Sequence, residues 1–159
     1  MIQLIAILDK DGALVGGPGV MPFVLDELQR LVREQVEKKT VVAGRRTWEL
    51  FGSELPAAQS IVLSRSSLDL PSKPSLVVPH LDVALGRARE WKHDVVLIGG
   101  ASVFRQALTR ADELRLAYLK PPQEHLLDFP AVDGEIWWPA ETKEHPAYEL
   151  ITYHRRDVA

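Results

Sequence analysis

Short apolar runs rich in Val, Ile and Leu recur along this chain of 159 residues and alternate with longer segments of helical periodicity. Apolar side chains on successive residues are typical of strands covered on both faces, and strands separated by helices pair in parallel through crossovers. The runs lie at residues 2–8, 40–43, 60–63, 75–78 and 94–98. We therefore predict an α/β fold with a central, mostly parallel sheet and flanking helices, in a single domain over residues 1–159.

Three of the intervening segments have the spacing of amphipathic helices. In the first, Leu25, Leu28, Leu31, Val32 and Val36 fall on one side of a helix with 3.6 residues per turn. The other two helices are expected over residues 81–91 and 102–108.

The last third of the chain lacks this alternation. Residues 113–119 and 148–154 predict two strands with no helical segment between them, so we expect them to pair antiparallel at the edge of the sheet. Several prolines stand between them, and we therefore expect an irregular connection over residues 120–142, with one short strand at most, near Ile136.

Charge and composition exclude several classes of function. With 19 basic and 22 acidic residues, the chain offers no broad positive field to a nucleic-acid backbone. The absence of cysteine excludes disulfides and thiolate chemistry and fits a reducing compartment, and no stretch approaches the roughly 20 apolar residues of a membrane span. The five histidines are scattered, so no metal site is expected. We expect a cytoplasmic protein, monomer or homodimer, whose partner is a small molecule.

Two of the apolar runs end in glycine at the point where a helical segment follows. Gly99 and Gly100 come after one run, and Gly44 comes after another and precedes Arg45 and Arg46. Glycine lets a ligand approach the backbone, and the free N–H groups of a helix start favour phosphate, although a glycine pair is also a simple solution for a tight turn. Cations at a helix start oppose the helix dipole, so the arginines favour a bound phosphate. Two such junctions in one sheet suggest a dinucleotide.

Two carboxylates, Asp26 and Glu27, are expected to open the first helix. Acidic residues in a first turn commonly do no more than complement the dipole or cap the helix. Glu27 stands one turn before Leu31 and flanks the apolar stripe, whereas Asp26 lies further toward solvent and is better placed to cap. A carboxylate at the rim of an apolar pocket can take up and donate a proton near neutral pH, which makes Glu27 the candidate acid.

In their order and spacing, these pieces resemble the dihydrofolate reductase family over residues 1 to about 119. The resemblance is carried by the opening strand, Met21-Pro22-Phe23, Gly44-Arg45-Arg46-Thr47-Trp48-Glu49, Ile61-Val62-Leu63-Ser64 and Ile98-Gly99-Gly100. It implies that the sheet binds NADPH, that a pterin lies between the first helix and the sheet, and that a loop over residues 9–23 closes on the nicotinamide. It also implies a role in forming tetrahydrofolate for one-carbon metabolism.

The resemblance also assigns residues. Glu27 would bind the amidine edge of the pterin and assist protonation at N5 before hydride reaches C6. Arg45, Arg46 and Arg65 would contact the adenosine 2′-phosphate. The further cofactor contacts would be Ala6, Ile7, Gly44, Thr47, Leu63, Ser64, Gly99, Gly100, Ala101, Ser102 and Val103. The pterin pocket would comprise Ile5, Ile7, Phe23, Glu27, Leu31, Phe51 and Leu55.

The chain also departs from the family pattern. Ala58 stands where the family has an arginine that clamps the glutamate carboxylate of folate, and losing a bidentate clamp weakens binding. Ala117 replaces the threonine that supports the catalytic carboxylate, and one residue is missing between Phe23 and Glu27. These departures leave three hypotheses: a reductase of dihydrofolate, a reductase of a tail-less pterin or a ribosylaminopyrimidine, and a nucleotide-binding protein without catalysis.

Overall fold

A computed structural model describes residues 1–15, 22–50, 52–66, 73–124 and 126–156, without the side chains at positions 22–25 and 52. Its strands are β1 (Ile2–Leu8), β2 (Leu14–Val15), β3 (Thr40–Gly44), β4 (Gln59–Leu63), β5 (Leu76–Val78), β6 (Val95–Leu97), β7 (Glu113–Leu119), β8 (Leu126–Leu127), β9 (Trp137–Glu144) and β10 (Tyr148–Arg155). Its helices are α1 (Pro22–Val36), α2 (Arg45–Leu50), α3 (Leu81–Glu90) and α4 (Ala101–Ala107), with one 3-10 turn at Gly52–Glu54.

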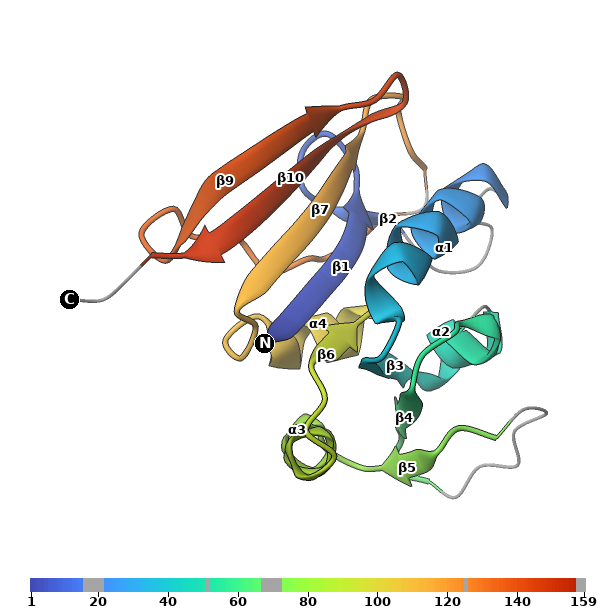
Figure 1. The fold of residues 1–159 in the computed structure, drawn as a ribbon. Coiled ribbons are helices and arrows are strands. Elements are labelled where there is room, and N and C mark those ends of the chain that lie inside the picture. The colour runs from blue at the N-terminus through green and yellow to red at the C-terminus, as the bar shows by residue number, and fades with distance from the viewer. Residues whose placement is uncertain (16–21, 51, 67–72, 125, 157–159) are drawn as a thin grey trace.

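Eight of the strands follow one another across a twisted sheet in the order β5-β4-β3-β6-β1-β7-β10-β9, and the short strands β2 and β8 extend it from β1, off this path (Figure 1). The pairs from β5 through β7 are parallel, and β10 pairs antiparallel with β7, with Tyr148 opposite Leu119. This confirms the predicted α/β class and the antiparallel C-terminal pairing. Each of the five apolar runs forms a strand whose ends differ from the predicted ends by no more than one residue.

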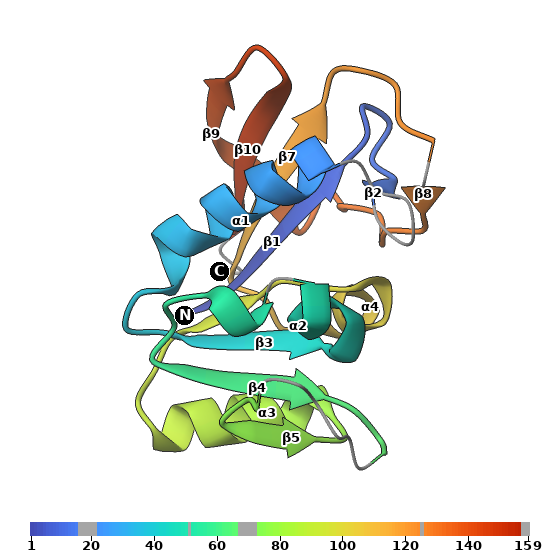
Figure 2. The same cartoon turned by 90° about the vertical axis from the view of Figure 1, so that its right-hand side faces the viewer.

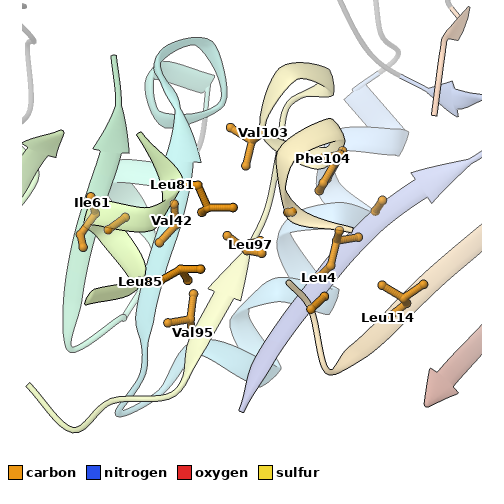
Figure 3. Packing of buried hydrophobic residues seen from close by; sticks show 14 of the residues in the cluster. Leu4, Val42, Ile61, Leu81, Leu85, Val95, Leu97, Val103, Phe104 and Leu114 are labelled. Carbon is orange, nitrogen blue, oxygen red and sulfur yellow. The ribbon is translucent and has the colours of Figure 1, made fainter. Parts of the chain in front are cut away.

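The helices cover both faces of the sheet (Figure 2). On one face, α3 and α4 bury Leu85, Phe104 and neighbouring side chains against alternate residues of the central strands, such as Leu4 and Leu97. Figure 3 shows this cluster, with Leu81 and Leu85 of α3 close to Val42 of β3. On the other face, α1 buries its predicted stripe, including Leu31 and Val32, against Ile5 and Ile7. Trp48 of α2 packs on Val62 of β4. Consecutive residues of β1 therefore serve two different cores.

Helix α1 begins at Pro22, three residues before the first position of the predicted stripe. Proline suits the first position of a helix, because its fixed φ is helical and the N–H that it lacks has no partner there. Asp26 and Glu27 therefore lie beyond the first turn, which contains no acidic residue. The prediction that they open the helix, with Asp26 as a cap, is wrong. Residues 16–21 of the expected closing loop lie outside the described residues.

The connection between β7 and β10 contains more strand than predicted. An eight-residue strand, β9, pairs with β10 along its length and forms the edge of the sheet, so β10 is not the edge. Pro139 stands opposite Tyr153 at the irregularity in this pairing, a position that an edge strand tolerates because proline has no N–H to donate. Within the described residues, no helix is long and apolar enough to cross a membrane.

Candidate active site

The two predicted glycine junctions meet where β3 and β6 end. The N–H of Ile98 donates to the carbonyl of Val42 at 3.1 Å, and the N–H of Gly44 donates to the carbonyl of Gly99 at 2.7 Å. These bonds continue the parallel pairing of the strands past their last residues, so α2 and α4 begin side by side. The carboxyl ends of parallel strands are where open α/β sheets bind ligands.

The glycines leave this junction without side chains. A Cβ at Gly44 would lie 3.6 Å from the nitrogen of Gly100, and a Cβ at Gly100 would lie 3.7 Å from the Thr47 hydroxyl oxygen. Gly99 has a φ of +121°, which only glycine adopts readily, and the Phe104 ring packs 3.4 Å from the position of its absent Cβ. Since α4 begins at Ala101, its first N–H groups have no partners within the helix. The backbone at Gly44, Gly99 and Gly100 is therefore not covered by side chains of its own, and these three residues are called here the glycine cradle.

The three predicted phosphate contacts differ in their surroundings. Arg45 forms an ion pair with Glu49 one turn later in α2, at 3.1 Å. Arg46 and Arg65 are exposed and form no ion pair within the part of the chain that the structure describes. Arg65 follows β4, the strand next to β3, and the N–H of Ser64 donates to the carbonyl of Val78 at 2.9 Å. Arg46 and Arg65 are therefore available to an anion beside the cradle.

The remaining predicted cofactor contacts are spread over both faces of the sheet. Val103 is buried, and Leu63 and Ala101 pack partly buried against the same cluster as Ala6, on the α3–α4 face. Ile7 belongs to the α1 face, and Ser102 is exposed. Ala6 and Ile7 thus point to opposite sides of β1, so their side chains cannot share a contact surface.

An apolar cluster on the α1 face contains most of the predicted pterin pocket. Ile5, Ile7 and Leu31 are buried in it, and Leu55 packs against it. Ile98, directly after β6, belongs to the same cluster and is not among the residues of the predicted pocket. Its place at the end of an apolar run, directly before Gly99, could have indicated it. Two further residues of the predicted pocket fall outside the described part of the chain: Phe51 as a whole and the side chain of Phe23.

Glu27 lies beside this cluster with only 18% of its side chain exposed. Its carboxylate forms an ion pair with Arg30, one turn further along α1, at 2.9 Å between Oε2 and Nη2. Arg30 also donates to the hydroxyl of Tyr148, the first residue of β10. The hydrogen bond to Glu27 is the chief cause that raises the pKa of Arg30. Sequence reasoning missed both partners. The spacing of three residues between Glu27 and Arg30 on one helix could have indicated their ion pair. Tyr148 is 118 residues from Arg30, and no local pattern joins these two residues.

The two alanines that depart from the expected pattern have contrasting surroundings. Ala58 is exposed just before β4, and its N–H donates to the carbonyl of Lys39 at 2.9 Å. Ala117 is fully buried on β7, opposite Ile7 of β1 and Leu150 of β10. Neither side chain can form a hydrogen bond.

Comparison with known proteins decides the family. The family model described as dihydrofolate reductase matches residues 1–156. The chain belongs to the dihydrofolate reductase family. It is 32% identical to dihydrofolate reductase type 3 of Salmonella typhimurium, over 96% of this chain and 93% of that protein. It is 30% identical to dihydrofolate reductase of Neisseria meningitidis serogroup A, over 97% of this chain and 98% of that one.

A solved structure extends the likeness to three dimensions. Dihydrofolate reductase from Enterococcus faecalis, complexed with NADP(H) and RAB-propyl, superposes with a TM-score of 0.81 at 28% identity, covering 99% of this chain and 97% of that one. Such agreement over both whole chains confirms the resemblance that the sequence motifs indicated. In this dihydrofolate reductase fold, the glycine cradle and the Glu27 cluster lie on neighbouring parts of the same sheet.

Proposed function

We propose that this chain is an NADPH-dependent oxidoreductase that reduces dihydrofolate to tetrahydrofolate in the cytoplasm. The observation that carries the proposal is Glu27, a carboxylate four-fifths buried beside an apolar cluster on α1. The glycine cradle at the ends of β3 and β6 supports the cofactor, and membership of the dihydrofolate reductase family supports the reaction.

The residues around the cradle fit NADPH. Gly44 and Gly100 have φ values that a side chain would permit, and a Cβ at either would fill space where a pyrophosphate can contact bare N–H groups. Arg46 and Arg65 would hold the 2′-phosphate, since they are exposed and form no ion pair within the described ranges. Ile7 and Gly99 would border the nicotinamide. When bound, NADPH supplies the hydride.

Glu27 would bind and orient the pterin. An ionised carboxylate accepts two parallel hydrogen bonds, which matches the N–H and amino donors on the amidine edge of a pterin. Its negative charge favours a proton on the ring, at N5, next to the carbon that receives the hydride. Ile5, Ile7 and Leu31 would exclude water from the ring, which strengthens that electrostatic effect.

A second candidate substrate is a dihydropterin without a glutamate tail. The observation that favours it is Ala58, which is exposed and carries no charge where the family resemblance places the carboxylate clamp. Within the described residues, no arginine lies between Trp48 and Arg65. A substrate without the tail has no carboxylate to bind at this position, so the absence of an arginine does not weaken its binding.

The proposal is tested by following NADPH absorbance with the purified protein and dihydrofolate, in parallel with a tail-less dihydropterin. We expect turnover of dihydrofolate at micromolar substrate. A KM shifted to millimolar for dihydrofolate, with an equal value for the tail-less compound, would assign the second substrate. No oxidation of NADPH with either compound, despite NADPH binding by calorimetry, would contradict a reductase and leave a nucleotide-binding protein.

A further inference from the structure

Arg30 links the candidate carboxylate on α1 to the start of β10, on the same face of the sheet. Its guanidinium contacts Glu27 at 2.9 Å and Glu34 at 3.5 Å, and it donates to the Tyr148 hydroxyl. Only one of these partners, Tyr148, comes from outside α1. The three groups Glu27, Arg30 and Tyr148, called here the Arg30 triad, thus join α1 to the start of β10.

Tyr148 is a rigid anchor for this triad. Its side chain is 4% exposed, and its ring stacks on His145 with centroids 4.2 Å apart and planes 12° apart. The Nδ1 atom of His145 in turn accepts the N–H of Ala147 at 3.1 Å, which fixes the imidazole in the turn between β9 and β10. Burial is the main cause that raises the pKa of Tyr148, and the charge of Glu27 and a hydrogen bond to it raise it further. The hydroxyl is therefore protonated and stays in place.

The direction of Arg30 separates it from the substrate-tail region. Leu28, two residues earlier, packs with Leu55 and Ala57 against the apolar cluster. Residues two apart on a helix point about 200° apart, so Arg30 faces β10 while Leu28 faces Leu55. Arg30 is thus not a substitute for the clamp absent at Ala58, and its available function is at Glu27.

The buried surroundings of Glu27 contain no other support. Ala117 offers no hydroxyl at the position where the family resemblance expects a threonine, and the hydrogen-bond partners of Glu27 among the described residues are Arg30 and Tyr148, the other two members of the triad. A carboxylate that must present both oxygens to a ligand needs a partner that fixes its rotamer.

We propose that Arg30, anchored by Tyr148, is the positioning residue that fixes the orientation of the Glu27 carboxylate, and that its positive charge beside the bound substrate sets the pH at which hydride transfer declines. This inference rests on the proposed role of Glu27. The positive charge of Arg30 opposes protonation of a substrate ring bound beside it, and the proton on that ring is the one that hydride transfer requires.

The other charged and titratable groups around the triad are few. Glu34 forms a second ion pair with Arg30 from the next turn of α1, and His145 stacks on Tyr148 from the turn that precedes β10. The side chains of Asp26 and Arg33 are exposed on α1, and among the described residues they form no ion pair with Glu27 or Arg30. Arg33 is therefore a matched control, because it is an arginine on the same helix outside the triad.

The test measures the single-turnover rate of hydride transfer against pH in the parent and in Arg30→Gln, Arg30→Lys, Tyr148→Phe and Arg33→Gln. Removing the positive charge should move the midpoint of the decline to higher pH by about half a unit to one unit, a modest shift because Arg30 is half exposed. At a pH above both midpoints, Arg30→Gln should thus retain a fraction of its plateau rate that is about 3- to 10-fold larger than the fraction that the parent retains. Tyr148→Phe should shift the midpoint in the same direction by less.

The outcomes distinguish this inference from the proposed function. Arg30→Lys should keep a midpoint close to that of the parent, because lysine retains the charge, and Arg33→Gln should match the parent. If Arg30→Gln and Tyr148→Phe both keep the parental midpoint while Glu27→Gln abolishes turnover, the role of Arg30 is refuted and that of Glu27 stands. If Glu27→Gln retains the parental rate and pH profile, the proposed role of Glu27 fails first.

Discussion

Restoring an arginine at position 58 tests how the substrate is recognised. In Ala58→Arg, the backbone is already fixed by the bond from the Ala58 N–H to the Lys39 carbonyl at 2.9 Å, and the side chain is exposed. The larger residue therefore needs no space in the core, and we expect the free energy of unfolding to change by no more than about 0.5 kcal/mol. The new guanidinium would reach the carboxylate of a bound folate tail.

The size of the effect follows from the exposure of the site. A hydrogen bond to a charged group contributes about 1.5–3 kcal/mol, and exposure to water reduces a carboxylate–guanidinium pair at this position to about 1–2 kcal/mol. That corresponds to roughly 5- to 30-fold tighter binding. Titration calorimetry with dihydrofolate and with a tail-less dihydropterin measures the two dissociation constants, and Ala58→Gln controls for side-chain length without charge. An equal gain for both ligands, or the same gain in Ala58→Gln, would refute the assignment of this position to the substrate tail.

Three further predictions concern the cofactor, the pocket and the alkaline limit of stability. Arg46→Ala and Arg65→Ala should each weaken NADPH binding by about tenfold and leave NADH binding unchanged. Arg89 is exposed elsewhere on the surface, so the control variant Arg89→Ala should affect the binding of neither cofactor. Equal losses for both cofactors in the first two variants would exclude a contact with the 2′-phosphate. Leu31→Ala should lower the free energy of unfolding, measured in urea, by about 2–5 kcal/mol, because Leu31 is 5% exposed. Leu50 is 60% exposed, so Leu50→Ala should change this free energy little. A similar loss of free energy in both variants would contradict the packing of α1. Burial is the main cause that raises the pKa of Tyr118 far above its usual value near 10, so the unfolded chain loses this proton first and stability should fall as pH rises above about 10. Tyr118→Phe should reduce that slope, and an unchanged slope between pH 10 and 11.5 would show that Tyr118 ionises equally in both states.

The strands that could be predicted are those with a recognisable apolar pattern, either buried on both faces or, as in β10, on alternate residues. The ends of β1 and β7 agree with the strands predicted at residues 2–8 and 113–119, because each is flanked on both sides by other strands and most of its residues are buried. The edge strand β9 could not be found in this way. Nearly all of its side chains are exposed, so it carries Glu, Lys and Pro139 in place of an apolar pattern, and only its pairing with β10 makes it a strand.

Candidate site residues divide along a similar line. Gly44, Gly99 and Glu27 were predictable, because a glycine at a strand–helix junction and a carboxylate beside an apolar stripe are local patterns. The contact between Arg30 and Tyr148 depends on the register of β10 against β7, which no segment of sequence encodes by itself. The position of Asp26 was mistaken for a cap because the helix begins earlier, at Pro22, than the apolar stripe indicates.

Glu27 is proposed to support proton transfer in an NADPH-dependent reduction. The most direct measurement is the single-turnover rate of hydride transfer to dihydrofolate in Glu27→Gln, with the exposed neighbour variant Asp26→Asn as its control. Glutamine keeps the shape of the side chain and removes its charge, so we expect a rate lower by about 10²- to 10⁴-fold, with NADPH affinity unchanged. Asp26→Asn should match the parent. A Glu27→Gln rate within threefold of the parent would contradict the claim.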